Sequence, residues 1–579
     1  MFKTCKNCQQ NLEITDEDLK FYDKISPIFT GKKYSLPPPN LCPDCRSQQR
    51  MQFRNFRNLY NAKSALSGEK IISMYHPQLN YKVYSINEWW SDQWEGLNFG
   101  QEYSFDKDFF EQFYDLQLKV PKLPLKQLQC EACEYSNFAF KSQNCYLVFG
   151  CVENQDCLYG HIVWRSKDCL DGLYIYECNF CYECLDCVGC YKSYFSTECV
   201  NCAETWFCHD CLGCNNCFGS TNLKQKSWYW NNEYLGKEKY LEKFKKISPL
   251  NYKTIKQAKQ DLSLRKKNQT VFPEIFGNLN ENVTGNHIYF SKNLTNCFDA
   301  KRCENCKFLY TSQTFTDCYD CNFTPGNCEL SYNCLAVGDS RNLINCREIS
   351  NSTNLIYCYE CQNCHDCFGC DGLKYKNYCI LNKQYSKEEY EKLVPKIIEA
   401  MKSPKSPLTR GLGHPLDKGG LGDCEWGEFF PSSISPFGYN ETVAQEYFPL
   451  TKNECLKKGF KWSDYEPEFP KVEKIIPANL LPDAISEIPD DILNWAVQCE
   501  ITKKPFKIIK PELDFYREHN LPIPHLHPDE RHKQRMALRN PRKLWKRSCI
   551  KCNAEIQTTY SPDRPEMVYC EKCYLEIVY

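Results

Sequence analysis

Long apolar segments are missing from this chain of 579 residues. The first residues, MFKTCKNCQQN, contain no apolar run, and no stretch reaches the roughly 20 apolar residues that a membrane-spanning helix needs. We therefore expect a cytoplasmic protein without a signal peptide and without membrane contact. An excess of charge of one sign is missing too. The net charge of −1 excludes a global field that would select a partner.

Signatures of common enzymes are also absent. The sequence contains no phosphate-binding loop, no GxSxG motif and no HExxH motif. We therefore expect a protein without enzymatic activity, with one alternative that is given below.

Cysteine, in contrast, is abundant, with 42 residues of 579. Clustered cysteines in the reducing cytoplasm bind metal more often than they form disulfides. Each end of the chain carries two CxxC pairs. Two thiolates three residues apart can chelate one ion from a tight turn, and two such turns complete a tetrahedron. This spacing predicts zinc as the cofactor of two quartets, which are Cys5, Cys8, Cys42 and Cys45, and Cys549, Cys552, Cys570 and Cys573.

The two ends are copies of one another. Residues 36–59 match residues 521–544 at a constant offset of 485. Each end therefore carries two consecutive zinc-ribbon modules, ribbon A and then ribbon B. In the N-terminal ribbon B the four ligand positions hold Ser64, Ser67, Ser85 and Glu88. Serine is a poor zinc ligand, so we expect this ribbon to be free of metal.

The C-terminal ribbon A has also lost part of its ligand set. Its four positions hold Cys499, Thr502, His527 and Glu530. One interpretation is decay to an ordinary hydrogen-bonded core. The alternative is an open zinc site formed by Cys499, His527 and Glu530, because an open fourth position is typical of catalytic zinc. That site would make the protein a zinc-dependent hydrolase.

Between the ends, cysteine follows a period of three. The 17 cysteines from Cys130 to Cys217 all lie on one register, and small or apolar residues fill its other positions. A second such register runs from Cys328 to Cys379, after a slip of one residue at 322–327. Neither a helix nor a flat strand has this period. We therefore predict a mainly β fold with small α content. It would consist of two narrow, cysteine-lined β-solenoids with coils of about 12 residues and helical caps, flanked by the tandem ribbons.

Some coils would be lined by cysteine at every inward position, and three interpretations remain open for them. The thiols could hold zinc, form disulfides that staple the coils, or act as small apolar side chains. The cysteines concerned are Cys178, Cys181, Cys184 and Cys187 in the first solenoid, and Cys358, Cys361, Cys364 and Cys367 in the second.

Two surfaces are candidates for partners. Outward aromatic residues of the acidic first solenoid would contact protein. The basic segments that follow each ribbon A could contact nucleic acid or a ribonucleoprotein, or could simply be solvated helix faces. The candidate contacts are Arg50, Arg54, Arg57, Arg535, Arg539 and Arg542.

These patterns predict a division of the chain that follows the order of its modules. The expected segments are 1–60 (zinc ribbon A), 61–95 (degenerate ribbon B), 96–129 (linker), 130–225 (solenoid 1), 226–268 (hairpin and capping helix), 294–375 (solenoid 2), 376–402 (capping helix), 403–498 (linker region), 499–546 (degenerate ribbon A) and 547–579 (zinc ribbon B).

Several motifs resemble those of a known family. The segment CKNC…EDLKFY…LCPDCR is similar to bacterial zinc-ribbon domains. FRNFRNLY, GEKIISMY, EYFPLTK, PDDILNWA, NPRKLW and TTYSPDRPE extend a resemblance to cysteine-rich zinc-ribbon proteins of reduced-genome bacteria over most of the chain. That resemblance implies zinc and no particular activity. The period of three also resembles the 12-residue coils of insect antifreeze proteins, but their Thr-x-Thr ladder is absent, so ice binding is not implied.

Overall fold

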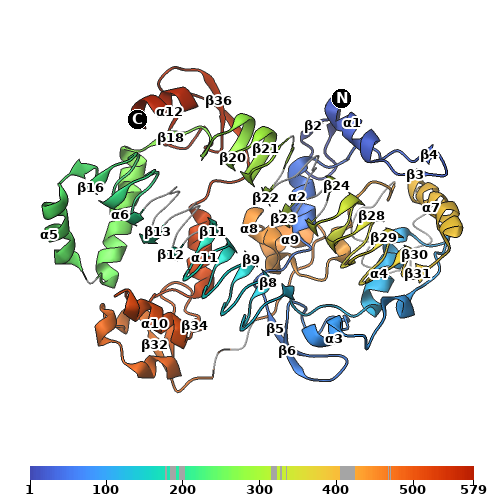
Figure 1. Ribbon diagram of the computed structural model, residues 1–579, viewed down its shortest axis with the longest axis horizontal. Helices are drawn as coiled ribbons and strands as arrows, with labels where there is room; N and C mark the ends of the chain where they lie inside the picture. Colours follow the sequence, from blue (N-terminus) through green and yellow to red (C-terminus); the bar gives the residue numbers. More distant parts are fainter. Residues whose placement is uncertain are drawn as a thin grey trace. The chain divides into compact units, whose positions relative to one another are not determined.

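The computed structural model describes residues 1–176, 179–182, 191–194, 203–248, 250–304, 306–308, 310–313, 322–325, 329–333, 335–403, 424–466, 469 and 471–578. The chain folds into two units, each assembled from segments far apart in the sequence (Figure 1). Unit 1 consists of residues 1–125, 275–464 and 542–544. Unit 2 consists of residues 126–274, 465–541 and 545–579. The N-terminal ribbons thus fold with the second cysteine-rich segment, and most of the C-terminal ribbon residues fold with the first.

Unit 1 combines short hairpins, helices and two parallel sheets. The sheets run in the orders β19-β20-β21-β22-β23-β25-β27 and β24-β26-β28-β29-β30-β31, where β31 is antiparallel. The helices are α1 (Asp16–Ile25), α2 (Pro43–Met51), α3 (Ile86–Trp90), α4 (Phe109–Lys119), α7 (Lys387–Lys402), α8 (Val443–Tyr447) and α9 (Lys452–Lys457). The strands are β1 (Phe2–Thr4), β2 (Asn11–Glu13), β3 (Ile28–Phe29), β4 (Lys32–Lys33), β5 (Tyr60–Lys63), β6 (Lys70–Ser73), β19 (Gly277–Asn278), β20 (Glu281–Tyr289), β21 (Lys292–Lys301), β22 (Tyr310–Gln313), β23 (Asn322–Pro325), β24 (Glu329–Tyr332), β25 (Leu335–Gly338), β26 (Arg341–Ile344), β27 (Arg347–Ser350), β28 (Thr353–Ile356), β29 (His365–Phe368), β30 (Asn377–Ile380) and β31 (Lys383–Gln384).

Unit 2 repeats this plan. Its parallel sheets run in the orders β11-β10-β9-β8-β7 and β12-β13-β14-β15-β16-β17, where β17 is antiparallel. The helices are α5 (Lys237–Ile247), α6 (Tyr252–Asn268), α10 (Lys510–Glu518), α11 (Pro528–Ala537) and α12 (Glu571–Val578). The strands are β7 (Gln127–Leu128), β8 (Asn137–Phe140), β9 (Phe149–Val152), β10 (His161–Trp164), β11 (Leu173–Tyr176), β12 (Asn179–Tyr182), β13 (Tyr191–Tyr194), β14 (Ala203–Trp206), β15 (Asn215–Phe218), β16 (Ser227–Trp230), β17 (Glu233–Tyr234), β18 (Val271–Pro273), β32 (Lys474–Pro477), β33 (Trp495–Gln498), β34 (Pro505–Phe506), β35 (Trp545–Ser548), β36 (Glu555–Thr558) and β37 (Met567–Tyr569).

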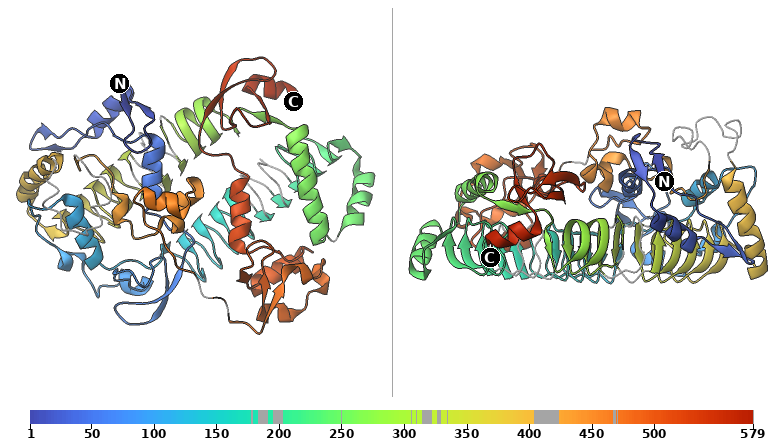
Figure 2. Two further views of the ribbon diagram at one scale, coloured as in Figure 1. Left: turned by 180° about the vertical axis from the view of Figure 1, so that it is seen from behind. Right: turned by 90° about the horizontal axis from the view of Figure 1, so that it is seen from above.

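The parallel strands of each unit follow a twelve-residue repeat, and we call residues 127–230 the first stack and residues 277–380 the second stack. Asn137 pairs with Phe149 in the first, and Thr353 pairs with His365 in the second. Figure 2 shows the strands of each stack lying side by side. Asn322 pairs instead with a residue thirteen positions later, which confirms the predicted slip of one residue.

The expected fold class is wrong. The described residues contain twelve α-helices beside these sheets, so the fold is mixed α/β and not mainly β. No sheet in them closes or curls into a solenoid. Outside the sheets, neighbouring repeats are joined by isolated β-bridges, such as the one between Gln143 and Gln155. These single bridges do not connect the edges of the sheets, so the sheets stay open. Helices also form where a linker was expected: α4 lies within residues 96–129, and its Phe109, Phe110 and Phe113 are fully buried.

Cysteine and serine occupy the inward positions because their side chains bond to the backbone of the stack. The Cys358 thiol donates to the carbonyl of Ile356 at 3.5 Å and to that of Cys367 at 3.6 Å. Ser352 Oγ accepts the backbone N–H of Cys364, twelve residues later, at 3.0 Å. A small side chain with one X–H group therefore satisfies buried backbone groups between neighbouring repeats.

Candidate metal centres

The N-terminal quartet lies where a hairpin meets a helix. Cys5 and Cys8 lie in the turn between β1 and β2, Cys42 is the N-cap of α2, and Cys45 follows in its first turn. Pro43 at the first helical position favours this start because its fixed φ suits a helix and its missing N–H costs no bond.

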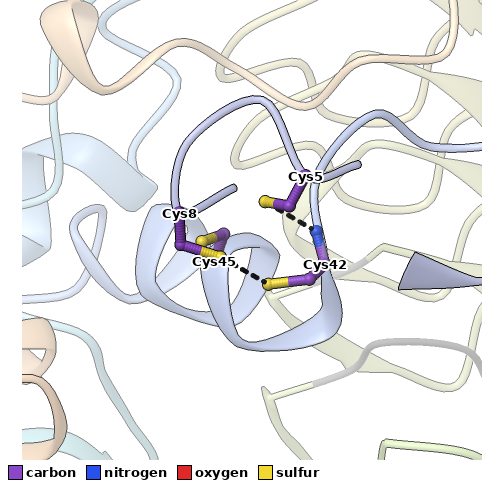
Figure 3. A group of neighbouring side chains, drawn as sticks. All are labelled: Cys5, Cys8, Cys42 and Cys45. Atoms are coloured by element: carbon purple, nitrogen blue, oxygen red, sulfur yellow. Dashed lines mark hydrogen bonds between the residues drawn. The ribbon is translucent and has the colours of Figure 1, made fainter. Parts of the chain in front are cut away.

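The four sulfur atoms of this quartet converge (Figure 3). All lie within 4.8 Å of one another, and the sulfur atoms of Cys8 and Cys42 are 3.6 Å apart. The backbone N–H of Cys42 donates to Cys5 Sγ at 3.2 Å, and the amide of Asn7 donates to Cys45 Sγ at 3.2 Å. Such N–H donors stabilise thiolates and fix their orientation. The sequence-based reasoning missed Asn7.

The thiols of this quartet influence each other's ionisation. A hydrogen bond from Cys45 lowers the pKa of Cys42 to about 5, although burial opposes this. The same bond raises the pKa of Cys45 well above its ordinary value. The Cys42 thiol therefore ionises more readily than an ordinary cysteine, and a bound cation would have to displace the proton of Cys45.

The C-terminal quartet has the same construction. Cys549 and Cys552 lie in the turn between β35 and β36, and Cys570 directly precedes α12, which contains Cys573. The four sulfur atoms again lie within 4.8 Å, and those of Cys552 and Cys570 are 3.7 Å apart. Burial raises the pKa of Cys549, but hydrogen bonds from the backbone of Cys552 and Cys570 outweigh this and lower it to about 6.

The four segments predicted to be ribbons share one turn, with or without cysteine at the predicted ligand positions. At Cys5, Ser64, Cys499 and Cys549 the backbone N–H donates to the carbonyl five residues later, at 2.8 to 3.0 Å. The residue four positions later has a positive φ in every copy, between 60° and 79°. The duplication seen in the sequence is thus repeated in the backbone.

In the N-terminal ribbon B, a carboxylate replaces the metal ligands. Ser64 Oγ donates to Glu88 Oε2, and the backbone N–H of Ser85 donates to the same oxygen at 2.9 Å. Burial raises the pKa of Glu88, but bonds from Ser64, Ser67 and Ser85 outweigh it and lower the pKa to about 2. Hydrogen bonds to an anion therefore connect the four positions.

The C-terminal ribbon A does not gather its candidate ligands. His527 Nδ1 accepts the backbone N–H of Asp529 at 3.2 Å, as the N-cap of α11. Glu530 accepts a bond from Gln534 at 3.2 Å. Within the described part of the chain, Cys499, His527 and Glu530 do not form a metal-ligand grouping.

The interior cysteines are arranged differently from the quartets. Cys358, Cys361, Cys364 and Cys367 are buried, and the thiol of each donates to a backbone carbonyl at 3.2 to 3.5 Å. Within the described residues, these four sulfur atoms do not converge as those of the quartets do. Of the other candidate set, Cys178, Cys184 and Cys187 lie outside the described residues, and the side chain of Cys181 is not described.

The candidate nucleic-acid contacts of unit 1 are turned inward. Arg50 is fully buried, and its Nε donates to Asn322 Oδ1 at 2.7 Å. Arg54 Nη2 forms an ion pair with Glu348 at 2.6 Å and is buried as well. Arg57 is half-buried. The second stack therefore binds Arg50 of α2 and Arg54, which lies just after this helix.

The remaining candidates are engaged in the same way. In unit 2, Arg535 forms an ion pair with Asp171 at 3.2 Å, and the guanidinium of Arg539 lies 3.9 Å from the ring centre of Tyr174. In unit 1, Arg542 pairs with a carboxylate of the second stack at 2.6 Å. The prediction that these arginines contact nucleic acid stays a prediction.

Compared with known proteins, the chain matches no family model, no curated protein and no solved structure. The resemblance to zinc-ribbon proteins therefore stays a prediction. No helix among the described residues is long and apolar enough to cross a membrane.

Proposed function

We propose that the protein is a zinc-stabilised, non-enzymatic binding or scaffold protein of the cytoplasm. The observation that carries this proposal is the convergence of four thiols within 4.8 Å in each quartet. Four thiolates fill the tetrahedral shell of zinc and leave no open position for substrate or water, as in structural sites. The donor set therefore fits zinc in a structural role.

In unit 1, zinc would fix the start of α2. Two of its ligands lie at this start, while Arg50 and Gln48 lie further along the same helix. Arg50 is bonded to the second stack, and the Gln48 amide donates to Tyr439 Oη at 2.8 Å. Anchoring one end of the helix orients the side chains that pack at the other.

In unit 2, zinc would fix the approach to α12. Cys570 follows β37, which pairs in parallel with β18. Tyr574 in α12 donates a hydrogen bond to Asp210 of the first stack, and this carboxylate also pairs with Lys224 at 2.7 Å. Each quartet thus supports a segment that packs on the stack of its own unit.

The alternatives receive less support. A zinc-dependent hydrolase would need Cys499, His527 and Glu530 to converge on one ion, and in the described part of the chain they form no metal-ligand grouping. A disulfide-stapled stack would need bonded cysteines, whereas the described cysteines are free thiols. Protein contact through the aromatic row of the first stack is also limited, because Tyr159 and Tyr182 are buried beside Tyr516 of α10.

The proposal is tested by hydrogen exchange with and without a zinc chelator. We expect chelation to speed amide exchange in residues 2–13 and 41–52, and also in the second stack around Asn333. The Cys424→Ser variant changes a half-buried cysteine outside both quartets and should behave like the unsubstituted protein. Unchanged exchange in α2 after removal of bound zinc would refute the structural role.

A further inference from the structure

Helices α5 and α6 carry a strong local excess of positive charge. From Lys237 to Asn268 the sequence contains eleven Lys or Arg residues and three Asp or Glu residues. Most of these basic side chains are exposed, including Lys239, Lys245, Lys256 and Lys267. The sequence predicts a hairpin and a capping helix at 226–268, but the excess of lysine there was not recognised, although a count along the sequence reveals it.

The need to cap the stack does not explain this charge, because the corresponding helix of unit 1 caps its stack without an excess of lysine. Residues 217–247 match residues 367–397 at an offset of 150, so α5 corresponds to the start of α7. Helix α7 contains four Lys and four Glu residues and no net charge. The excess of lysine in unit 2 therefore serves something other than packing.

The arrangement of α6 favours a polyanion over a membrane. Its apolar residues Ile255, Ala258 and Leu262 are buried in the core of unit 2. A helix that binds a bilayer needs an apolar face free to enter the interface. In α6 that face is occupied, while lysines remain outside.

Aromatic side chains accompany the lysines. Tyr234, in strand β17 of the β16–β17 hairpin, is 64% exposed, and Tyr229 of β16 packs beside it with ring centres 5.5 Å apart. Trp228 is half-buried, with the ammonium of Lys237 located 5.9 Å from its ring. The corresponding positions of unit 1, at the same offset of 150, hold Cys379 and Gln384. The extra aromatics and the extra charge thus occur together.

We propose that the β16–β17 hairpin, α5 and α6 form a binding surface for single-stranded nucleic acid. Lysines would follow the phosphate backbone, and the tyrosines would stack on bases, as in sequence-tolerant single-strand binders. This inference rests on the proposed function in one respect, because it names a partner for a protein proposed to act by binding. It does not depend on the zinc sites. These elements belong to unit 2, and Figure 1 shows α5, α6 and β16 in green.

The test is fluorescence anisotropy with a labelled 20-nucleotide single-stranded RNA of mixed sequence, titrated with the full chain across a salt series. The substitutions Lys237→Glu and Lys246→Glu together should weaken binding at least tenfold at low salt. Each lost phosphate contact should reduce the slope of log affinity against log salt by about 0.7. The control pair Lys387→Glu and Lys396→Glu makes the same charge change at the corresponding positions of α7 and should alter affinity less than twofold.

A second variant and two further probes keep the test decisive. Tyr234→Ala should weaken single-strand binding several-fold and leave any binding of duplex of equal length unchanged. Vesicles containing phosphatidylserine should not be bound. Absence of RNA binding at low salt, equal loss in the α5 and α7 pairs, or preference for vesicles would overturn the inference. The zinc content of the same samples is measured separately, so failure of the structural-zinc proposal is distinguishable.

Discussion

Arg50 Nε donates a hydrogen bond to Asn322 Oδ1 at 2.7 Å, with no part of the arginine exposed to solvent. This bond connects the helix that begins at the N-terminal cysteine quartet to the second stack. The side chain of Arg50 therefore points into the protein, although it belongs to a segment rich in basic residues.

Replacing Arg50 by Met should destabilise unit 1 by about 2 to 4 kcal/mol. The change leaves the buried amides of Asn322 and Asn333 without their donor, and unpaired buried polar groups are costly. Chemical denaturation followed by tryptophan fluorescence measures the effect. Arg341→Met, at an exposed arginine of the same unit, should change stability by less than about 0.5 kcal/mol. Similar losses in both variants would contradict the role assigned to Arg50.

Replacing Cys42 by Ser should remove one zinc equivalent and lower the stability of unit 1. Zinc bound at 1,000 times its dissociation constant contributes about 4 kcal/mol, and the variant should lose stabilisation of that order. Thermal unfolding with and without added zinc measures it. Added zinc should stabilise the unsubstituted protein and the Cys424→Ser control, and should stabilise Cys42→Ser less. An equal response in all three would contradict a site at Cys42.

The Glu88 carboxylate should stabilise the N-terminal ribbon B only when it is ionised. Because its folded pKa is lowered to about 2, the stabilisation is present above the ordinary pKa of glutamate and is lost as the pH falls toward 2. The group is partly exposed, so solvent screening reduces the effect to about 1 kcal/mol. Glu88→Gln should therefore be less stable than the parent at pH 7 and equally stable near pH 2. Glu69→Gln, an exposed position, should show no such pH dependence.

The interior thiols of the second stack should resist modification in the folded protein. Cys358, Cys361, Cys364 and Cys367 are buried and their thiols are bonded to backbone carbonyls. A thiol reagent followed by peptide mass spectrometry should leave them unlabelled until the protein unfolds. Chelation should first release the thiols of the two terminal quartets. Early labelling of the interior set upon chelation would instead indicate that these cysteines hold metal.

Part of this architecture follows from the sequence and part does not. CxxC spacing and the offset of 485 identify both quartets, and the period of three identifies the inward positions of the stacks. The left-handed backbone was missed. Asn342, Asn345, Asn351 and Asn354, each directly before an inward residue, have φ between 49° and 57°. Asparagine tolerates this region better than most residues, so its recurrence was the available signal.

Long-range packing explains the other errors. The N-terminal segments fold with the second stack, and most of the C-terminal residues fold with the first. This arrangement depends on contacts such as that of Arg50 with Asn322, which no local sequence pattern encodes. The basic segments resembled exposed helix faces because sequence shows charge but not orientation. Helix α4 forms because its phenylalanines pack against residues far away in the sequence, as Phe113 does against Phe430. Tertiary contacts thus determine the structure and orientation of segments that propensity and periodicity alone do not predict.

Metal analysis of protein purified under reducing conditions tests the central claim most directly. Elemental analysis should give two zinc ions per chain, one of which is lost in Cys42→Ser and the other in Cys570→Ser. The double variant should bind none. Zinc retained in the double variant, or a parent protein that holds no zinc with all its thiols reduced, would contradict the account.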